Sequence, residues 1–277
     1  MEASLSIPSV FRKTIALPQD HGSWVFILSP LLIGLFAGRN WSIASIYLVL
    51  AALSAFLIRQ PVTILVKVYS KRRPSRELPA AIFWTALYAF IGLLAIAGLL
   101  IQGDLFVIYL AIPGIPVFAL HLVLVSRRSE RRQIGVELIA AGVLALAAPA
   151  GYWVSLGNPS TTGWLLWLLT WFQSAASIVY AYLRLEQRQL KTIPDLGQRV
   201  GMGRRALLYT SFNLAGVSLL AWMHIVPALL SIPYAVQWLE TLWGTLRPAV
   251  RQRPTAIGIR QLVVSALFTI LFILTWG

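Results

Sequence analysis

Ionisable and amide side chains inside long apolar stretches are the residues of this sequence that could do chemistry. Glu137 and Glu240 each lie in such a stretch without a Lys or Arg within one helical turn. Tyr209 and Asn213 are four residues apart, so a helix places them on one face. A charged side chain at the centre of a spanning helix costs about 2.5–3.5 kcal/mol. These residues therefore indicate either a polar cavity or pairing with basic loop residues.

Further polar side chains lie at the same ends of the apolar stretches as the basic residues. Interfacial anchoring and hydrogen bonding between helices are the alternative explanations for them. We expect the loops Arg59–Glu77 and Arg184–Arg205 to meet above one cavity lined by Glu137, His121 and Asn213. No catalytic residue is assigned. The candidate ligand-binding residues are His21, Gln60, Lys67, Arg72, Arg73, His121, Glu137, Tyr180, Arg184, Lys191, Arg199 and Asn213.

Short catalytic motifs are absent from the sequence. It contains no HExxH, Walker loop or GxSxG, its three His are too scattered for a metal pair, and it has no Cys. Gly197, Gly201 and Gly203 lie in a basic stretch that could wrap a phosphate with backbone N–H groups or form a flexible turn. We therefore predict no metal site.

The composition is that of an integral membrane protein. Hydrophobic residues make up 58% of the chain, charged residues only 12%, and the mean hydropathy is +0.76. Too little polar surface remains to cover a soluble domain. The net charge of +14 comes from short basic runs between apolar stretches, which is typical of membrane topology and argues against nucleic-acid binding. The predicted fold is an all-α, polytopic transmembrane helical bundle.

A spanning helix needs about 20 mostly apolar residues, which gives nine expected spans. They follow an N-terminal segment, residues 1–22, and form a single integral membrane domain, residues 23–277. The expected helices are 23–38, 41–58, 79–102, 105–126, 134–156, 163–183, 206–222, 225–244 and 259–276.

The basic residues predict the orientation of these spans. All but one of the 23 Lys and Arg residues, Arg39 being the exception, fall in segments that alternating helices place on one side. Because basic loops stay inside, we expect a multi-pass protein of the cell membrane with a cytoplasmic N-terminus and a C-terminus on the opposite side.

The opening run LPQDHGSWVFILSPLLIGLFAG, residues 17–38, resembles the start of YwiC-like membrane proteins. Those proteins enter their first helix with a Pro–Gln/Asn–x–His–Gly–x–Trp run. The likeness continues more loosely through residues 56–74, 137–153 and 177–189. It implies a membrane protein of a family without an established activity.

The expected plan is also similar to that of UbiA-type prenyltransferases, with nine helices and long cytoplasmic loops after the second and sixth. The segment KTIPDLGQRVGMGRRALLY, residues 191–209, is similar to their passage after the second Asp motif. In that family two Asp-rich motifs hold Mg²⁺ ions that bridge a prenyl diphosphate. Here the two loops offer only Glu77, Glu186 and Asp195, too few carboxylates for the usual two-metal clamp. Neither Mg²⁺ nor another cofactor is expected.

Three functions remain open. The first is a bundle that binds an isoprenoid or another anionic amphipathic lipid, with or without transferase activity. The second is a transporter for a small organic anion, with Glu137 and Glu240 as proton or counter-ion sites. The third is a non-catalytic scaffold or assembly subunit with membrane-protein partners. Membrane lipids are expected partners in each case.

Overall fold

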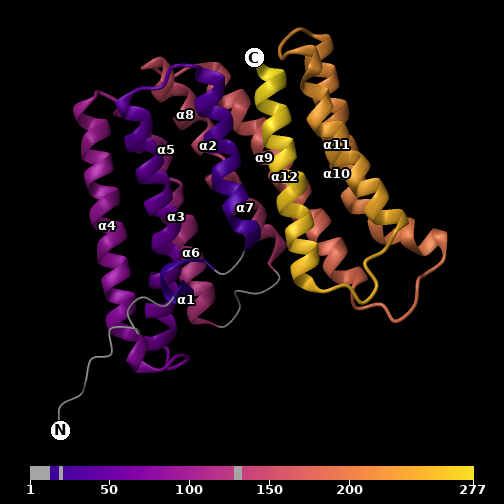
Figure 1. Cartoon of the computed structure of the whole chain (residues 1–277), viewed down its shortest axis with the longest axis horizontal. Coiled ribbons are helices and arrows are strands. Elements are labelled where there is room, and N and C mark those ends of the chain that lie inside the picture. The colour runs from indigo at the N-terminus through magenta and orange to yellow at the C-terminus, as the bar shows by residue number, and fades with distance from the viewer. Residues whose placement is uncertain (1–12, 19–20, 128–132) are drawn as a thin grey trace. The chain divides into compact units, whose positions relative to one another are not determined.

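The computed structural model describes residues 13–18, 21–127 and 133–277, and within these ranges it contains helices and no strand (Figure 1). The predicted all-α fold is confirmed for this part of the chain. The predicted N-terminal segment falls mostly outside the described residues, as do Arg12, Arg128, Arg131 and Arg132.

The chain divides into two compact units. Unit 1 consists of residues 1–20 and 41–136, and unit 2 of residues 21–40 and 137–277. The prediction of one membrane domain stays a prediction, and each unit is described by itself. The helices of unit 1 are α1 (Lys13–Ala16), α3 (Ile43–Tyr69), η3 (Ser75–Glu77), α4 (Leu78–Ile101), α5 (Phe106–Ala111) and α6 (Gly114–Ser126).

The described part of unit 2 contains seven α-helices and two 3₁₀ turns. Helix α7 starts at the boundary between the units, and most of its length lies in unit 2. The helices are η2 (His21–Trp24), α2 (Val25–Gly38), α7 (Ile134–Leu144), α8 (Ala147–Leu156), α9 (Thr161–Gln187), α10 (Leu196–Trp222), η4 (Ala228–Leu230), α11 (Ser231–Leu246) and α12 (Pro254–Trp276).

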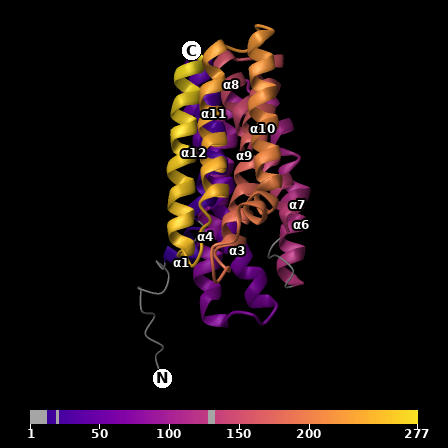
Figure 2. The ribbon, with the colours of Figure 1, turned by 90° about the vertical axis from the view of Figure 1, so that its right-hand side faces the viewer.

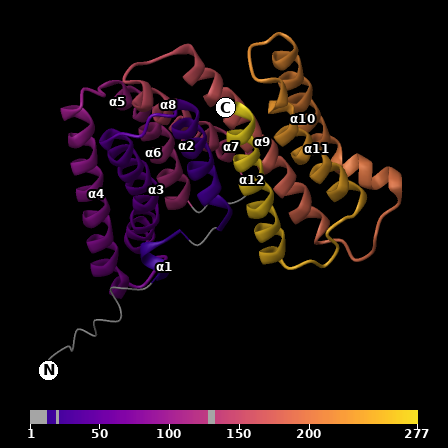
Figure 3. The same ribbon diagram turned by 45° about the horizontal axis from the view of Figure 1, so that its top comes forward.

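In unit 1, α3 and α4 pack along their length, as Figure 3 shows. Small residues allow this approach, because Gly98 lies against the Tyr47 ring and a Cβ added to Gly92 would be 3.3 Å from Ser54. The short helix α1 closes the end of the pair, with Ile15 buried beside Ile64. The Tyr88 hydroxyl donates to the Ala16 carbonyl at 3.1 Å and fixes α1 on α4.

In unit 2, α2 and α8 approach so closely that their backbones touch. A Cβ on Gly34 would collide with the Ala148 carbonyl oxygen, and one on Gly151 would lie 2.9 Å from the Leu35 nitrogen. Small residues are the usual means by which helices meet in a membrane, where lipid offers no hydrophobic drive. Elsewhere in the unit, α10, α11 and α12 lie side by side (Figure 2).

Helix α3 does not end at residue 58 as predicted. It continues through Arg59, Gln60 and Pro61 to Tyr69, so most of the expected loop 59–78 is helix. Proline removes one backbone hydrogen bond but is tolerated within membrane helices. Its 27 residues correspond to about 40 Å, more than the roughly 30 Å hydrocarbon core, which lets the polar end extend beyond the bilayer.

The Gly-rich basic stretch is neither a phosphate-binding loop nor a flexible turn. Helix α10 begins at Leu196, not 206, and includes all three glycines. Asp195 caps it, since its side chain accepts from the Gln198 N–H at 2.8 Å. Gly203 is required by packing, because a Cβ there would collide with Thr245 of α11.

The last two helices also differ from their predicted bounds. Helix α11 begins at Ser231, not at 225 as predicted. Pro227 directly precedes the 3₁₀ turn η4, and His224 has a left-handed backbone with φ 57°. Helix α12 begins at Pro254, five residues before the prediction, since proline suits the first helical turn. Arg260 therefore lies inside α12, not at its boundary.

Prolines break two of the expected spans. Pro113 separates α5 from α6, and Pro149 cannot donate to the Ala145 carbonyl at the junction of α7 and α8. At that junction Leu146 donates instead to Val143 at 3.1 Å, and the Gly142 carbonyl accepts from the Trp167 indole at 2.8 Å. A side chain of α9 thus satisfies a carbonyl near the break.

Among the described residues, six of the nine predicted spans form helices that are long and apolar enough to cross a membrane. A multi-pass helical bundle is therefore supported, while the count of nine spans stays a prediction. Of the rest, α2 is apolar but has only 14 residues, α11 has 16, and α10 has Arg199, Arg204 and Arg205 in its first ten. The six are Ile43–Tyr69, Ser75–Ile101, Phe106–Ser126, Ile134–Leu156, Thr161–Gln187 and Pro254–Trp276.

Replacing Gly34 by Ala tests the contact between α2 and α8. A methyl group there would collide with the Ala148 carbonyl, and overpacking of this kind costs about 1–3 kcal/mol. We expect a lower midpoint of thermal unfolding in detergent. Gly216→Ala is the matched control, since nothing lies within 4 Å of its Cβ position. Equal midpoints for the two variants would show that the helices do not meet as described.

Candidate functional site

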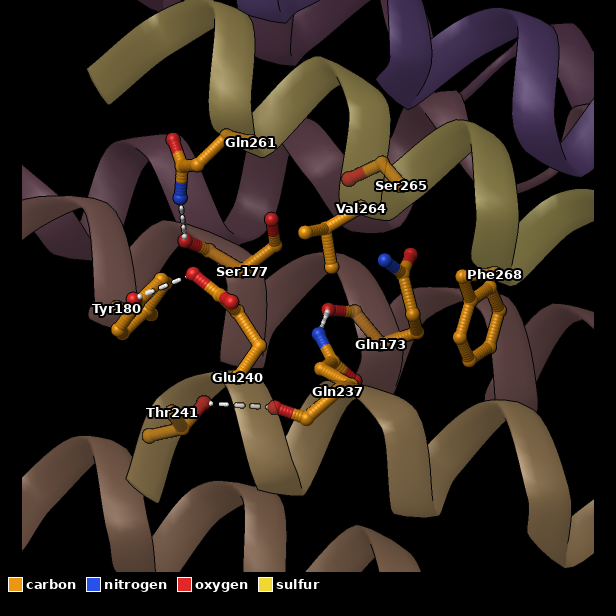
Figure 4. Close-up of a pocket in the computed structure, with 10 residues that line it drawn as sticks. All are labelled: Gln173, Ser177, Tyr180, Gln237, Glu240, Thr241, Gln261, Val264, Ser265 and Phe268. Atoms are coloured by element: carbon orange, nitrogen blue, oxygen red, sulfur yellow. Dashed lines mark hydrogen bonds between the residues drawn. The ribbon is translucent and has the colours of Figure 1, made fainter. Parts of the chain in front are cut away.

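Polar residues from three helices of unit 2 line two adjoining pockets, the larger of which is shown in Figure 4. On α9 they are spaced by four, three and four residues, which places them on one face. On α11, Gln237 is three residues before Glu240 and four before Thr241, and on α12 Gln261 is four residues before Ser265. The residues are Gln173, Ser177, Tyr180 and Arg184 on α9, Gln237, Glu240 and Thr241 on α11, and Arg260, Gln261 and Ser265 on α12.

Glu240 is the carboxylate at the centre of this cluster. Its Oε1 accepts from the Tyr180 hydroxyl at 2.8 Å and from the Arg260 Nε at 2.6 Å. Its Oε2 accepts from the second Arg260 nitrogen at 2.7 Å. The paired side chains differ in exposure, 45% for Arg260 and 11% for Glu240. The bidentate pair therefore joins a solvent-accessible cation to a nearly buried acid.

Arg184 is a second cation beside the same carboxylate, and it is only 2% exposed. One of its terminal nitrogens donates to the Gly244 carbonyl at 2.7 Å, the Arg247 carbonyl at 2.8 Å and the Gln187 Oε1 at 2.9 Å. The two carbonyls end α11, where the helix dipole is negative. Arg184 is thus held by backbone and amide oxygens.

Trp243 and Gly244 shape the space between the two arginines. The Arg260 guanidinium lies 3.7 Å from the centre of the Trp243 ring, and that of Arg184 lies 5.5 Å from it. Both contacts have cation–π geometry. A Cβ on Gly244 would collide with the Tyr180 hydroxyl, so glycine at this position lets Tyr180 reach Glu240.

Amide side chains line the inner part of the pocket. The Gln261 Nε2 donates to the Ser177 carbonyl at 2.9 Å, and the Gln237 Nε2 donates to the Gln173 carbonyl at 3.1 Å. The Oε1 of Gln237 is buried and accepts no hydrogen bond from the described residues. The free space holds about one or two water molecules, so a donor such as water would satisfy this oxygen.

A second, smaller pocket lies toward the helix ends and shares Tyr180 and Gln261 with the first. Arg184 and Arg260 both line it, together with Gln252 and Ile257. The two pockets therefore adjoin each other: the larger is lined by the Glu240 carboxylate, and the smaller, nearer the ends of α9 and α12, by the two cations.

Only part of the predicted ligand-binding set meets at this cluster. Tyr180 and Arg184 do, and the predicted pairing of Glu240 with a basic residue is confirmed by Arg260. Arg199 instead donates to the Pro194 carbonyl at 2.7 Å and the Leu246 carbonyl at 3.1 Å. Lys191 is exposed between α9 and α10.

Other predicted residues of unit 2 do not line these pockets. Glu137 accepts from the Tyr182 hydroxyl at 2.7 Å, and Asn213 donates to the Phe172 carbonyl at 2.9 Å. His21 begins η2, and its side chain lies outside the described part of the structure.

The remaining predicted residues belong to unit 1. Gln60 donates to the Thr14 carbonyl at 2.9 Å, Arg72 donates to the Val125 carbonyl, and Arg73 pairs with Glu77 at 2.8 Å. Lys67 lies in the last turn of α3, and His121 stacks on Phe118 with ring centres 6.5 Å apart. That the basic loops of the two units meet above one cavity stays a prediction.

The sequence contained a signal for residues that the predicted set omits. Glu240, Gln237 and Gln173 interrupt apolar runs. Gln237 and Glu240 are three residues apart, and Gln173 is four residues before Ser177, so each pair lies on one face of its helix. Gln261 follows Arg260 directly, and both lie at the start of the predicted span 259–276, where Arg260 was treated as a helix-boundary residue. Among the described residues no group of three or more His, Asp or Glu side chains could hold a metal ion.

Apolar helices of spanning length, with polar groups turned inward, define a multi-pass helical membrane protein. Residues 17–152 match the YwiC-like protein family. The predicted membership of this family is thereby confirmed, over about half of the chain. Searches of curated proteins and of solved structures returned no match.

Replacing Arg184 by Met tests the buried cation. The change removes the charged donor of both the Gly244 and Arg247 carbonyls. Gly244 keeps the Gln187 Nε2 at 3.2 Å, whereas a buried carbonyl left unpaired, as that of Arg247 would be, costs about 1–3 kcal/mol. We expect a clear fall in the thermal midpoint. Arg188→Met, one turn later, is the control, because Arg188 is half-buried and donates to Gln252 at 3.3 Å. A loss no larger than that of the control would contradict the role given to Arg184.

Proposed function

We propose that this YwiC-like membrane protein binds an anionic amphiphile of the membrane, an isoprenoid or other lipid with a phosphate or carboxylate headgroup. The site is the basic end of unit 2. One observation carries the proposal: two guanidinium groups, Arg184 and Arg260, line one small pocket, and Glu240, which pairs with Arg260, is the one carboxylate of the adjoining larger pocket among the described residues. The cluster has an excess positive charge that an anion would neutralise.

The surrounding helix ends add to this excess. Residues 184–205 and 240–260 contain ten Lys or Arg and three Asp or Glu. They form the end of α9, the start of α10, the end of α11 and the start of α12. The Arg188 hydrogen bond to the Gln252 carbonyl joins two of these segments directly. An anion approaching this end meets a positive field that concentrates it locally.

Apolar surface beside Arg260 favours a lipid over a free ion. Ile259 and Val263 flank Arg260 on α12 and are 58% and 60% exposed, and Ile257 lines the smaller pocket. A hydrocarbon tail can lie along these side chains while its headgroup reaches the guanidinium. Arg260, as the more exposed cation, makes the first contact with the headgroup.

The proposal includes an orientation. The basic end of unit 2 faces the cytoplasm, because Lys and Arg are retained on that side during insertion. The C-terminus, at the other end of α12, then lies on the opposite side. The headgroup would be taken from the cytoplasmic leaflet, and the chain is proposed to reside in the cell membrane.

Binding of farnesyl phosphate to the full-length protein in neutral detergent tests the ligand class. We expect farnesyl phosphate to bind and farnesol not to, as measured by calorimetry. Dodecyl phosphate distinguishes recognition of the isoprenoid chain from recognition of any anionic amphiphile, and inorganic phosphate tests whether a tail is needed. Arg260→Gln removes a bidentate charged contact and should weaken binding about tenfold to a hundredfold.

Arg253→Gln is the matched control, an exposed arginine just before α12. Its affinity should stay within about threefold of the unchanged protein, as for a solvent-screened charge. Equal binding of farnesol and farnesyl phosphate, or equal losses in the two variants, would contradict the proposed site.

The absence of cysteine allows a direct test of orientation. Arg253→Cys and Asn158→Cys place single exposed thiols at opposite ends of unit 2. We expect a membrane-impermeant maleimide to label Asn158→Cys in intact cells and Arg253→Cys only in inverted vesicles. The reverse pattern would place the basic end outside.

A further inference from the structure

Glu240 occupies the donors that an incoming anion would use. The Nε and one terminal nitrogen of Arg260 both donate to the Glu240 carboxylate, at 2.6 Å and 2.7 Å. The Glu240 carboxylate thus occupies the position on Arg260 that a lipid headgroup would take. An external phosphate or carboxylate can take the same two donors only by replacing it.

A displaced Glu240 cannot move into water. Its side chain is 11% exposed and lies among α9, α11 and α12 beside Tyr180. A carboxylate that loses its cation in such surroundings is unfavourable, and the usual resolution is uptake of a proton. Solvent that reaches the 45% exposed Arg260 side chain is the source of the proton in this proposal.

A protonated carboxyl needs an acceptor, and one is present. Gln237 is three residues before Glu240 on α11, so both side chains lie on one helix face, and both line the larger pocket (Figure 4). The Gln237 Oε1 is buried and unpartnered within the described residues. Its Nε2 is already used on the Gln173 carbonyl, which leaves the oxygen directed to another donor.

The groups that face Glu240 leave few rivals for the proton. Helix α9 contributes Tyr180 and Arg184, and α12 contributes Arg260. Helix α10 also packs on α11, but its buried residues along this length, Gly203, Ala206 and Thr210, do not titrate. Glu240 is the one carboxyl lining the two pockets in the described chain.

We propose that anion binding between Arg184 and Arg260 is coupled to uptake of one proton by Glu240, which turns from Arg260 to the Gln237 Oε1. This coupling rests on the proposed function, since it needs an anion at the same pocket. It makes the affinity for the anion depend on pH and links the occupancy of Arg260 to the protonation of Glu240.

The test measures binding of hexanesulfonate, an amphiphile whose own charge does not change between about pH 6 and pH 8. In the unchanged protein, affinity should rise as pH falls, approaching tenfold per pH unit, because one proton enters with each anion. Glu240→Gln carries no competing charge. Its affinity should be independent of pH and, at pH 8, tighter than that of the unchanged protein.

Two further variants separate the outcomes. Glu186→Gln removes an exposed acid of α9 and should keep the pH dependence. Gln237→Leu keeps the Glu240–Arg260 pair but removes the acceptor, so its affinity at pH 6 should fall several-fold. A pH indicator added with saturating hexanesulfonate should record about one proton taken up by the unchanged protein and none by Glu240→Gln.

The results distinguish this inference from the proposed function. Binding that is independent of pH in the unchanged protein, or a pH dependence that persists in Glu240→Gln, overturns the coupling and leaves the anion site standing. Failure of both hexanesulfonate and farnesyl phosphate to bind contradicts the proposed function and the coupling together.

Discussion

The hydrogen bonds of Arg184 are the interaction on which the polar end of unit 2 depends. The guanidinium is almost fully buried, so its donors must be satisfied inside the protein. They find the Gly244 and Arg247 carbonyls, which end α11 and have no partner within their own helix. The same hydrogen bonds therefore satisfy both the buried guanidinium and the free carbonyls at the end of α11, and they join α9 to α11.

Other features of the cluster follow from that contact. Gln187 donates to the Gly244 carbonyl at 3.2 Å and accepts from the Ala249 N–H at 3.2 Å, so the last turn of α9 also holds the connection to α12. With the helices this close, position 244 has no room for a side chain, and Tyr180 passes over it to Glu240. The placement of Glu240 opposite Arg260 thus depends on Gly244 and Arg184, although neither of these residues takes part in the Glu240–Arg260 salt bridge.

Much of the fold could be predicted from hydropathy alone, because the bilayer allows few structures. Helix α4 and the all-α class followed from apolar runs of spanning length, and family membership followed from residues 17–38. The ends of helices were harder to predict. From the sequence alone, Arg59, Gln60 and Pro61 resemble a loop. Helix α3 nevertheless continues through them, since a long helix can carry polar residues beyond the hydrocarbon.

The candidate site was harder to predict than the fold, because it depends on which helix faces meet. The polar character of Glu240 and Gln173 was visible in sequence, but their shared pocket depends on the packing of α9, α11 and α12. Arg260 was placed at the boundary of the predicted helix, because that helix starts at Pro254, earlier than the apolar run suggests. Asn213 was visible as a polar residue within an apolar run and Arg199 as a basic loop residue, yet each donates to a backbone carbonyl elsewhere.

The two arginines of the cluster have different kinds of partner: Arg184 donates to neutral oxygens, and Arg260 pairs with a carboxylate. Stability alone would favour pairing the one carboxylate with the buried cation, because unpaired buried charge is the most costly kind. Instead Arg184 is held by neutral oxygens, and Glu240 pairs with Arg260, which is 45% exposed and open to exchange with solutes. The fixed arginine maintains the positive charge while the exposed one can change partners. A buried arginine held by neutral oxygens beside a solvent-accessible ion pair is the arrangement on which the proposed anion site rests.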